Sequence, residues 1–373
     1  MQIDALSLAE LGLGPWAAPL EIPPAAPPAR CTVIVVGAGI AGLSTALTLS
    51  ERNVPVVVLD RQFGSGATGR SGGIVLGNTL VGPAPGFEGC EQALCAWIAE
   101  QGVECGLAWT GCLELARDER LEASPIDWTD SGPTRVAETH AGGVLDPVRL
   151  LNGLLVAAER AGARLINGTT VQRVESGSDG LVVSGDRVRI SADRVVMAVD
   201  AVSWPTRYHE WEPWEQRTLT VALQSGQVEP DLPDAIGLGG RQPFYTRDLP
   251  LLWGRLLPDG TFMFGRELVP FPRESIPGAL STQLASAGDR LIARVRGLHP
   301  RLKDVAIRRL WAGPTARTAA GVPALVEDRD LPGVLWVGGC GGHGLAQSFR
   351  LGRMAGRRIE RSLARQAAHA KEY

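Results

Sequence analysis

The chain contains 373 residues, of which 45% are hydrophobic and 21% are charged, so it can form two packed lobes and is not a mini-protein. Its 37 basic and 40 acidic residues leave a formal net charge of -3, which argues against nucleic acid as a partner. Six cysteines without a CxxC pair argue against a zinc ribbon or a disulfide framework and favour a reducing compartment.

The first 30 residues show neither the basic start nor the cleavage site of a signal peptide, and they end in the proline-rich stretch EIPPAAPPAR. Proline fixes φ and lacks an N–H donor, so we expect residues 1–30 to form an extended tether and a domain to begin near Cys31. No apolar run reaches the roughly 18 residues of a membrane span. We therefore predict a cytoplasmic protein with no membrane partner.

Residues 31–60 have the pattern of an apolar strand, a glycine turn, a helix and a second strand that ends at Asp60. The turn reads Gly37-Ala38-Gly39-Ile40-Ala41-Gly42. In a dinucleotide-binding unit the first glycine permits the tight turn, the second lets backbone approach the pyrophosphate, and the third lets helix and strand pack closely. Asp60 is expected to bind the adenosine ribose, which disfavours NADP, but this fingerprint alone does not separate NAD from FAD.

The later elements suggest a second lobe inserted into the first. We expect a helix within residues 91–109, with its cysteines in the core, and a second helix after Asp146. Short strands follow to about residue 199, and the tryptophan- and proline-rich residues 204–311 predict a largely antiparallel lobe. The chain closes with a buried strand, a glycine cluster and a long helix that begins near Gly344.

Three glycine-rich motifs, in this order, carry a resemblance to a known family. GAGIAG with Asp60 is followed by GATGRSGG (Gly66 to Gly73) and, late in the chain, by GCGGHG (Gly339 to Gly344). In these motifs the chain resembles the glycine oxidase, sarcosine oxidase and D-amino-acid oxidase superfamily of FAD enzymes. It looks most like the γ-glutamylputrescine oxidoreductase branch, and the resemblance covers most of residues 30–365.

The resemblance implies a fold that is α/β plus α+β, a Rossmann-like FAD-binding domain with an inserted antiparallel-sheet substrate domain. The FAD-binding domain would be discontinuous and comprise residues 31–90, 145–203 and 312–373. The substrate domain would comprise residues 91–144 and 204–311. The changes of composition along the chain fit these boundaries.

The same resemblance implies which residues bind FAD. The last helix would direct its N-terminal end at the flavin, where the helix dipole stabilises negative charge on the reduced ring. We predict non-covalent FAD, because Arg70 stands at the histidine position used for attachment in some branches and residues 311–325 contain no cysteine. The expected cofactor-binding residues are Gly37, Gly39, Ile40, Ala41, Gly42, Asp60, Arg61, Ala67, Thr68, Ser71, Gly72, Gly73, Val171, Gly339, Gly341, Gly342, His343, Gly344 and Leu345.

Amine oxidation by a flavin requires no dedicated proton-abstracting residue, because the cofactor supplies the difficult chemistry. The resemblance places His343 beside the flavin, in a role that is either catalytic or structural. Arg255, with Tyr245 and Trp253, forms either an aromatic wall that tolerates a cation or ordinary sheet packing. No spacing of histidines indicates a metal site. The candidate catalytic residues are His343, Arg70, Met263 and Arg255.

Related branches hold a substrate carboxylate with an arginine or lysine, but the matching positions here are Thr315 and Ala346. We therefore predict oxidative deamination of a small-molecule amine, with hydride transfer from its α-carbon to flavin N5 and hydrolysis of the imine. Molecular oxygen or another acceptor would complete the cycle. Met263 replaces the lysine that activates oxygen in sarcosine oxidases, so both an oxidase, which we favour, and a dehydrogenase stay open.

Three other functions stay open at this point. The first is an amino-acid oxidase of glycine or D-amino-acid type, with a relocated carboxylate anchor at Arg317 or Arg70. The second is a flavin-binding subunit without turnover, and the third is an NAD-dependent dehydrogenase.

Overall fold

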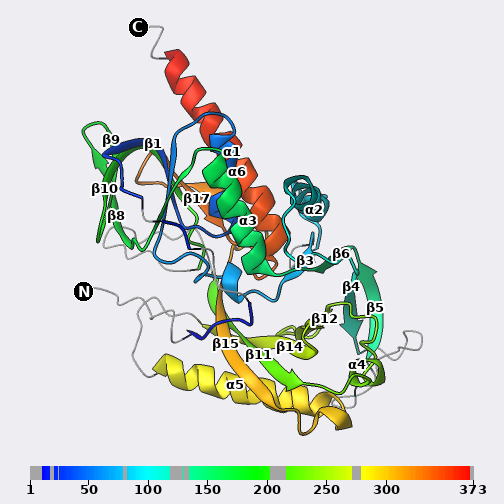
Figure 1. The fold of residues 1–373 in the computed structure, drawn as a ribbon. Coiled ribbons are helices and arrows are strands. Elements are labelled where there is room, and N and C mark those ends of the chain that lie inside the picture. Colours follow the sequence, from blue (N-terminus) through cyan, green and yellow to red (C-terminus); the bar gives the residue numbers. More distant parts are fainter. Residues whose placement is uncertain are drawn as a thin grey trace.

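The computed structural model describes residues 11–16, 21–23, 25–78, 82–117, 128, 134–201, 216–270 and 279–369. Figure 1 shows two lobes, each built on its own sheet. One sheet is mainly parallel and the other mainly antiparallel, so the fold class predicted from the sequence is confirmed. Trp204, Trp211 and Trp214 lie outside the described residues.

The sheet of the first lobe has eight strands within the described residues. They are β1 (Arg30–Val36), β2 (Val56–Asp60), β7 (Arg164–Asn167), β8 (Val171–Gly177), β9 (Gly180–Gly185), β10 (Arg189–Met197), β16 (Ala324–Glu327) and β17 (Val334–Gly338). The main path runs β16-β17-β10-β1-β2-β7, and β1 pairs in parallel with both β2 and β10. The continuous apolar run of β1 fits this position, because a strand between parallel neighbours is covered on both faces.

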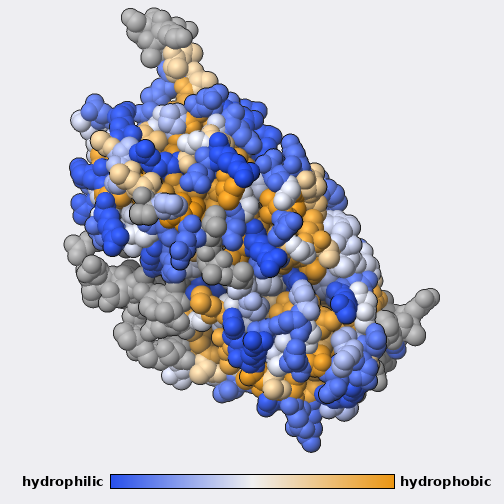
Figure 2. Space-filling view, in the orientation of Figure 1, coloured by the Kyte–Doolittle hydropathy of each residue, from blue (hydrophilic) through white to orange (hydrophobic). Residues whose placement is uncertain are grey.

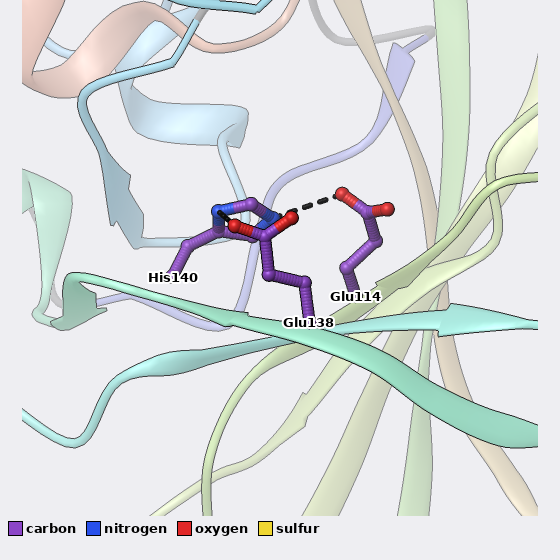
Figure 3. Close-up of side chains that lie close together, drawn as sticks. All are labelled: Glu114, Glu138 and His140. Atoms are coloured by element: carbon purple, nitrogen blue, oxygen red, sulfur yellow. Dashed lines mark hydrogen bonds and ion pairs between the residues drawn. The ribbon is translucent and has the colours of Figure 1, made fainter. Parts of the chain in front are cut away.

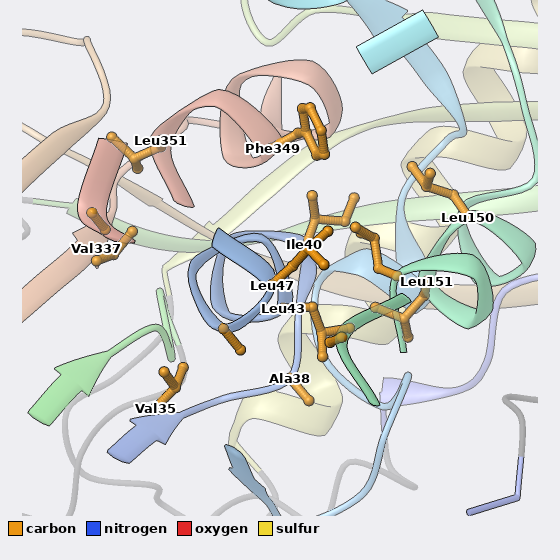
Figure 4. Packing of buried hydrophobic residues seen from close by; sticks show 14 of the residues in the cluster. Val35, Ala38, Ile40, Leu43, Leu47, Leu150, Leu151, Val337, Phe349 and Leu351 are labelled. Carbon is orange, nitrogen blue, oxygen red and sulfur yellow. The ribbon is translucent and has the colours of Figure 1, made fainter. Parts of the chain in front are cut away.

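Four longer helices pack in the first lobe: α1 (Ile40–Ser50), α2 (Cys90–Gln101), α3 (Pro147–Arg160) and α6 (Gly344–His369). Figure 4 shows α1 between α3 and α6, with Leu43 and Leu47 among their buried side chains. Helix α3 begins where the sequence predicts, because the Asp146 carboxylate accepts the backbone N–H of Val148 at 2.9 Å.

Helix α2 is shorter than the predicted segment. It ends at Gln101 because Gly102 adopts a left-handed conformation with φ of 62°. Trp109, at the end of the segment predicted to be helical, lies outside the helix and is 47% exposed. Although we assigned residues 91–144 to the substrate domain, the α2 side chains Leu94 and Trp97 lie in the same hydrophobic cluster as α1 and α6.

The sheet of the second lobe has seven strands within the described residues, in the order β15-β11-β14-β13-β12-β4-β5. These are β4 (Cys112–Ala116), β5 (Arg135–His140), β11 (Gln216–Gln227), β12 (Phe244–Thr246), β13 (Trp253–Leu256), β14 (Thr261–Pro270) and β15 (Ile307–Arg317). Their neighbours are α4 (Leu232–Ala235), α5 (Ala279–Leu298) and the short 3₁₀ helix η3 (Pro300–Leu302). Between the lobes lie the 3₁₀ helix η2 (Thr68–Arg70) and a ribbon formed by β3 (Ile74–Leu76) and β6 (Gly142–Val144).

The two faces of the second sheet have different partners. One face packs against α5 through a core that includes Phe244, Phe262 and Phe264. The opposite face carries Trp253 and Arg255 and contacts the first lobe, because Trp253 lies against Gly72. Because successive side chains of a strand point to opposite faces, alternate residues pack either in the core beneath α5 or against the first lobe.

The surface follows the usual division between polar and apolar residues. Figure 2 shows hydrophilic residues over most of the visible face, with smaller groups of hydrophobic residues between them. Helix α6 buries Leu351 and Ala355 while Arg357 and Arg358 are exposed. Among the described helices, none combines the length and the apolar content that crossing a membrane requires.

Candidate active site

The turn between β1 and α1 requires its glycines. Gly37 has a φ of 105°, and a Cβ there would lie 2.4 Å from the carbonyl oxygen of Ala198. A Cβ on Gly42 would lie 1.9 Å from the carbonyl oxygen of Gly37. The turn therefore brings α1 against the sheet more closely than any side chain would allow.

The start of α1 fits the pyrophosphate of a dinucleotide. A Cβ on Gly39 would meet just the Thr68 hydroxyl, at 3.4 Å, among the described residues. Gly39 caps α1 without a side-chain hydrogen bond in the described structure, and the first helical turn contains no acidic residue. Neither the cap nor the first turn of the helix thus supplies an anion, and Gly39, Ile40 and Ala41 would hold a phosphate there.

Asp60 ends β2 beside the same turn. Its Oδ2 accepts the backbone N–H of Ala38 at 2.6 Å, and its Oδ1 accepts that of Gln62 at 2.8 Å. Burial raises the pKa of this carboxyl, while the two backbone donors lower it. Asp60 therefore fixes the glycine turn and remains partly exposed, at the position expected for a ribose contact.

The second glycine-rich motif forms a loop that includes η2. A Cβ on Gly66 would meet no described atom within 4 Å, so one side of the loop has room for a ligand. Ala67 caps η2, and the Thr68 hydroxyl lies 3.4 Å from the backbone nitrogen of Ile40. The loop and the start of α1 are therefore adjacent, as the binding of one cofactor by both motifs requires.

Arg70 points away from bulk solvent. Its side chain is buried, its Nε donates to the carbonyl oxygen of Gly12 at 3.1 Å, and burial lowers its pKa to about 10. Its own carbonyl oxygen accepts the indole N–H of Trp311 at 3.0 Å. Arg70 thus joins the loop of the first lobe to β15 of the second.

The face of the second sheet that contacts this loop is aromatic and tightly packed. Met263, opposite Arg255 in the pairing of β14 with β13, is fully buried in a small cluster with Trp311. The Arg255 Nη1 donates to the carbonyl oxygens of Gly73 and Leu145, both at 2.9 Å. Burial lowers the pKa of Arg255 to about 10. In this arrangement Arg255 binds loop backbone.

The third glycine motif forms the turn between β17 and α6. Gly339, Gly341 and Gly342 all have positive φ, and the backbone N–H of Gly341 donates to the carbonyl oxygen of Ala316 at 2.8 Å. The Asp200 carboxylate accepts the backbone N–H of Gly339 at 2.9 Å. Asp200 is not predicted from the sequence, because its one local signal is its place three residues after the end of β10.

His343 stands at the end of this turn, before Gly344 and the buried Leu345 of α6. Its Nδ1 is buried and has no hydrogen-bond partner among the described residues. Burial lowers the pKa of His343 to about 4, although a backbone hydrogen bond to Gly341 raises it. A neutral imidazole with an unused polar atom fits a neighbouring cofactor, which would supply the missing partner.

The remaining residues considered from the sequence lie on several different elements. Val171 begins β8 and is buried opposite Gly185, and Arg61 directly follows β2. Thr315 forms a hydroxyl contact of 2.8 Å with Thr218. Arg317, two residues further along β15, donates from its Nη2 to the side chain of Gln216.

Tyr245 pairs with Trp253 across β12 and β13, and its hydroxyl reaches a charged cluster on β4 and β5. Figure 3 shows three members of this cluster, Glu114, Glu138 and His140. Glu114 Oε2 accepts the Tyr245 hydroxyl at 2.7 Å and lies 2.9 Å from His140 Nε2, while Arg247 binds Oε1. The ligand atoms of Glu114, Glu138 and His140 all lie within 4.8 Å of one another. Arg247 already neutralises the charge of Glu114. We therefore interpret this cluster as an ion-pair network that links β4, β5 and β12.

A family model described as FAD dependent oxidoreductase matches residues 32–358. The chain belongs to this family of FAD-dependent oxidoreductases. This assignment confirms the superfamily and the FAD cofactor predicted from the three glycine motifs, whereas the γ-glutamylputrescine branch stays a prediction.

Comparisons with individual proteins show what this oxidoreductase is similar to. A probable oxidoreductase OrdL of Rhizobium meliloti is 24% identical over 87% of this chain and 82% of its own length. Glycine oxidase from Geobacillus kaustophilus has a TM-score of 0.68 at 20% identity, covering 90% of this chain and 95% of that chain. L-Amino acid deaminase from Proteus myxofaciens has a TM-score of 0.69 at 14% identity, with 92% of both chains covered. These structures share the fold of the oxidoreductase.

Proposed function

We propose that this oxidoreductase catalyses the oxidative deamination of an amine and holds FAD non-covalently. When bound, FAD accepts a hydride equivalent from the carbon beside the amine nitrogen, which leaves an imine for hydrolysis by water. The start of α1, the loop at residues 64–73 and the turn at residues 339–344 would hold the cofactor. A neutral His343 would hydrogen-bond at the last of these without adding a positive charge.

One observation carries the choice of substrate class. The two arginines considered above as carboxylate anchors have protein partners, because Arg70 binds Gly12 and Arg317 binds Gln216. Arg255, on the sheet that faces the loop, binds loop carbonyls. An amine that lacks an adjacent carboxylate needs no such anchor. The buried Met263 and Trp311, with the partly buried Trp253, would exclude water from the reacting carbon.

Amino-acid oxidation is the second candidate, supported by the names of the fold neighbours, which include glycine oxidase and L-amino acid deaminase. In this case Arg317 would have to leave Gln216 and bind a substrate carboxylate. An arginine and a carboxylate form a paired, charge-assisted hydrogen bond, so the anchor would be essential for affinity.

An anaerobic reduction screen tests both candidates. The FAD-loaded protein is mixed with primary and secondary amines, including γ-glutamylputrescine-type amines, and with glycine, sarcosine, D-amino acids and L-amino acids. We expect bleaching of the flavin absorbance by amines, whereas reduction by amino acids alone would favour the second candidate. No reduction by any compound would contradict both and favour a flavin-binding subunit without turnover.

Two additions sharpen the screen. Admitting oxygen after reduction separates an oxidase, which recovers its colour quickly, from a dehydrogenase, which needs another acceptor. Arg317→Ala should leave amine oxidation unchanged and should raise KM for an amino-acid substrate if Arg317 is its anchor. Acid precipitation should leave the yellow cofactor in the supernatant, because we expect no covalent bond to the protein.

A further inference from the structure

Residues 11–16 lie between the two lobes, far in sequence from the elements that they contact. Leu11 is 2% exposed and belongs to the hydrophobic cluster of the second lobe. The Gly14 carbonyl oxygen accepts a hydrogen bond of 2.5 Å from Arg309 Nη1 on β15. These contacts attach the segment to the second lobe, within the stretch that we expected to be a tether.

The same segment also contacts the glycine-rich loop of the first lobe. The Gly12 carbonyl oxygen accepts the Arg70 Nε–H, and the Trp16 indole N–H donates to the carbonyl oxygen of Ser71 at 3.0 Å. The Arg255 guanidinium carbon lies 5.6 Å from the centre of the Trp16 ring, a cation–π distance. Trp16 therefore packs between the loop and the sheet of the second lobe.

Four consecutive carbonyl oxygens of this loop are bound by side chains from outside it. Trp311 binds that of Arg70, Trp16 binds that of Ser71, and Arg255 binds those of Gly72 and Gly73. Two of these three side chains come from the second sheet, and the third comes from the N-terminal segment. Because glycines give the backbone many accessible conformations, such external hydrogen bonds decide which one the loop adopts.

We propose that residues 11–16 form an inter-lobe strap in which Trp16 is a positioning residue, holding residues 69–73 in the conformation that receives FAD. The proposal rests on the FAD dependence of the family and on the contacts of the strap, and it does not depend on the substrate. Its failure and the failure of the proposed amine oxidation would therefore be separate results.

The test compares Trp16→Ala, Trp16→Phe and Leu13→Ala in the full chain. Leu13 lies in the same segment but is 63% exposed, which makes it the matched control. Fluorescence titration of the apoprotein gives the dissociation constant for FAD, and hydrogen exchange of the apoprotein gives the protection of residues 64–76. Circular dichroism and the thermal midpoint establish that each variant is folded.

We expect Trp16→Ala to weaken FAD binding on the order of tenfold, since it removes a partly buried hydrogen bond and the packing of the ring. Exchange in residues 64–76 should become faster. Trp16→Phe should fall between Trp16→Ala and wild type, and Leu13→Ala should match wild type. Unchanged or tighter FAD binding in Trp16→Ala would overturn the proposal, as would unchanged exchange. If Trp16→Ala does not fold, the same two measurements on Trp16→Phe decide the question.

Discussion

A Cβ built on Gly352 would lie 2.3 Å from the carbonyl oxygen of Ala41, so α6 and α1 meet almost backbone to backbone. Ser44 is also close to this position, with its Cβ at 2.7 Å. This contact sets the distance of the last helix from the helix that follows the dinucleotide turn. Gly356, one turn further along α6, makes a similar contact, because its Cβ would lie 2.7 Å from the Thr48 Cβ. The spacing of the two helix starts that we assign to the cofactor therefore depends on glycines of α6.

Gly352→Ala should destabilise the protein by about 1–3 kcal/mol, because the added methyl group forces apart two packed helices. Chemical denaturation measures this free energy of unfolding. Gly288→Ala in α5 is the matched control, since its Cβ would meet Leu310 at an ordinary 3.4 Å. Replacing that helical glycine should be neutral or stabilising by up to about 1 kcal/mol. Equal stability changes in the two variants would contradict the close-contact argument.

Gly39→Ala should weaken FAD binding without affecting the folding of the apoprotein. Its φ of -74° suits alanine, and the new methyl group would meet just the Thr68 hydroxyl among the described residues, so the apoprotein should fold normally. FAD affinity should fall on the order of tenfold or more, because the methyl group occupies space that the pyrophosphate needs. The thermal midpoint of the apoprotein and an FAD titration check the two halves. If this variant bound FAD as tightly as the wild type, Gly39 would not be part of the proposed phosphate site.

Glu114→Gln should lower stability at neutral pH by about 1–3 kcal/mol, because Tyr245, His140 and Arg247 lose a charged acceptor. Burial raises the pKa of Glu114, but the hydrogen bonds from these three partners outweigh it and lower the pKa to about 2. A depressed carboxyl pKa gives a contribution that is present above the unfolded value of about 4.3 and is lost as pH falls towards 2.

The difference between wild type and Glu114→Gln should therefore shrink as denaturation is repeated at lower pH. Glu138→Gln is the control in the same cluster, because its side chain is 59% exposed and should contribute little. A gap between wild type and Glu114→Gln that stays constant down to pH 3 would contradict the charge assignment.

His343→Gln should flatten the pH dependence of apoprotein stability in the acid range. Burial lowers the folded pKa of His343 from 6.5 to about 4, so between these values the unfolded chain binds more protons than the folded chain. Wild-type stability should consequently rise with pH across this window. Thermal midpoints of wild type and variant, measured from pH 4 to 7, test the sign. Parallel curves for the two proteins would mean that the pKa of the imidazole is not lowered in the folded state.

The sequence by itself determined the local parts of the cofactor site. The sequence pattern within residues 31–60 predicts a strand, a glycine turn and a helix. Gly37 and Gly42 are needed because a side chain there would clash with residues close by or with the adjoining sheet. The turn at Gly37, the position of Asp60 at the end of β2 and the start of α3 after Asp146 were all predicted from such local rules. The family and FAD followed from the order of three such motifs.

The tertiary structure alone decided how these parts are held together. Trp311 and Arg70 are 241 residues apart in sequence, and Trp16 and Ser71 are 55 apart, so neither pair leaves a periodic signal. The placement of α2 against α6, the role of Asp200 at the Gly339 turn and the occupation of Arg255 by loop carbonyls arise in the same way. A hydrogen bond between distant segments depends on the folded path of the backbone, which brings donor and acceptor together only after both lobes have formed.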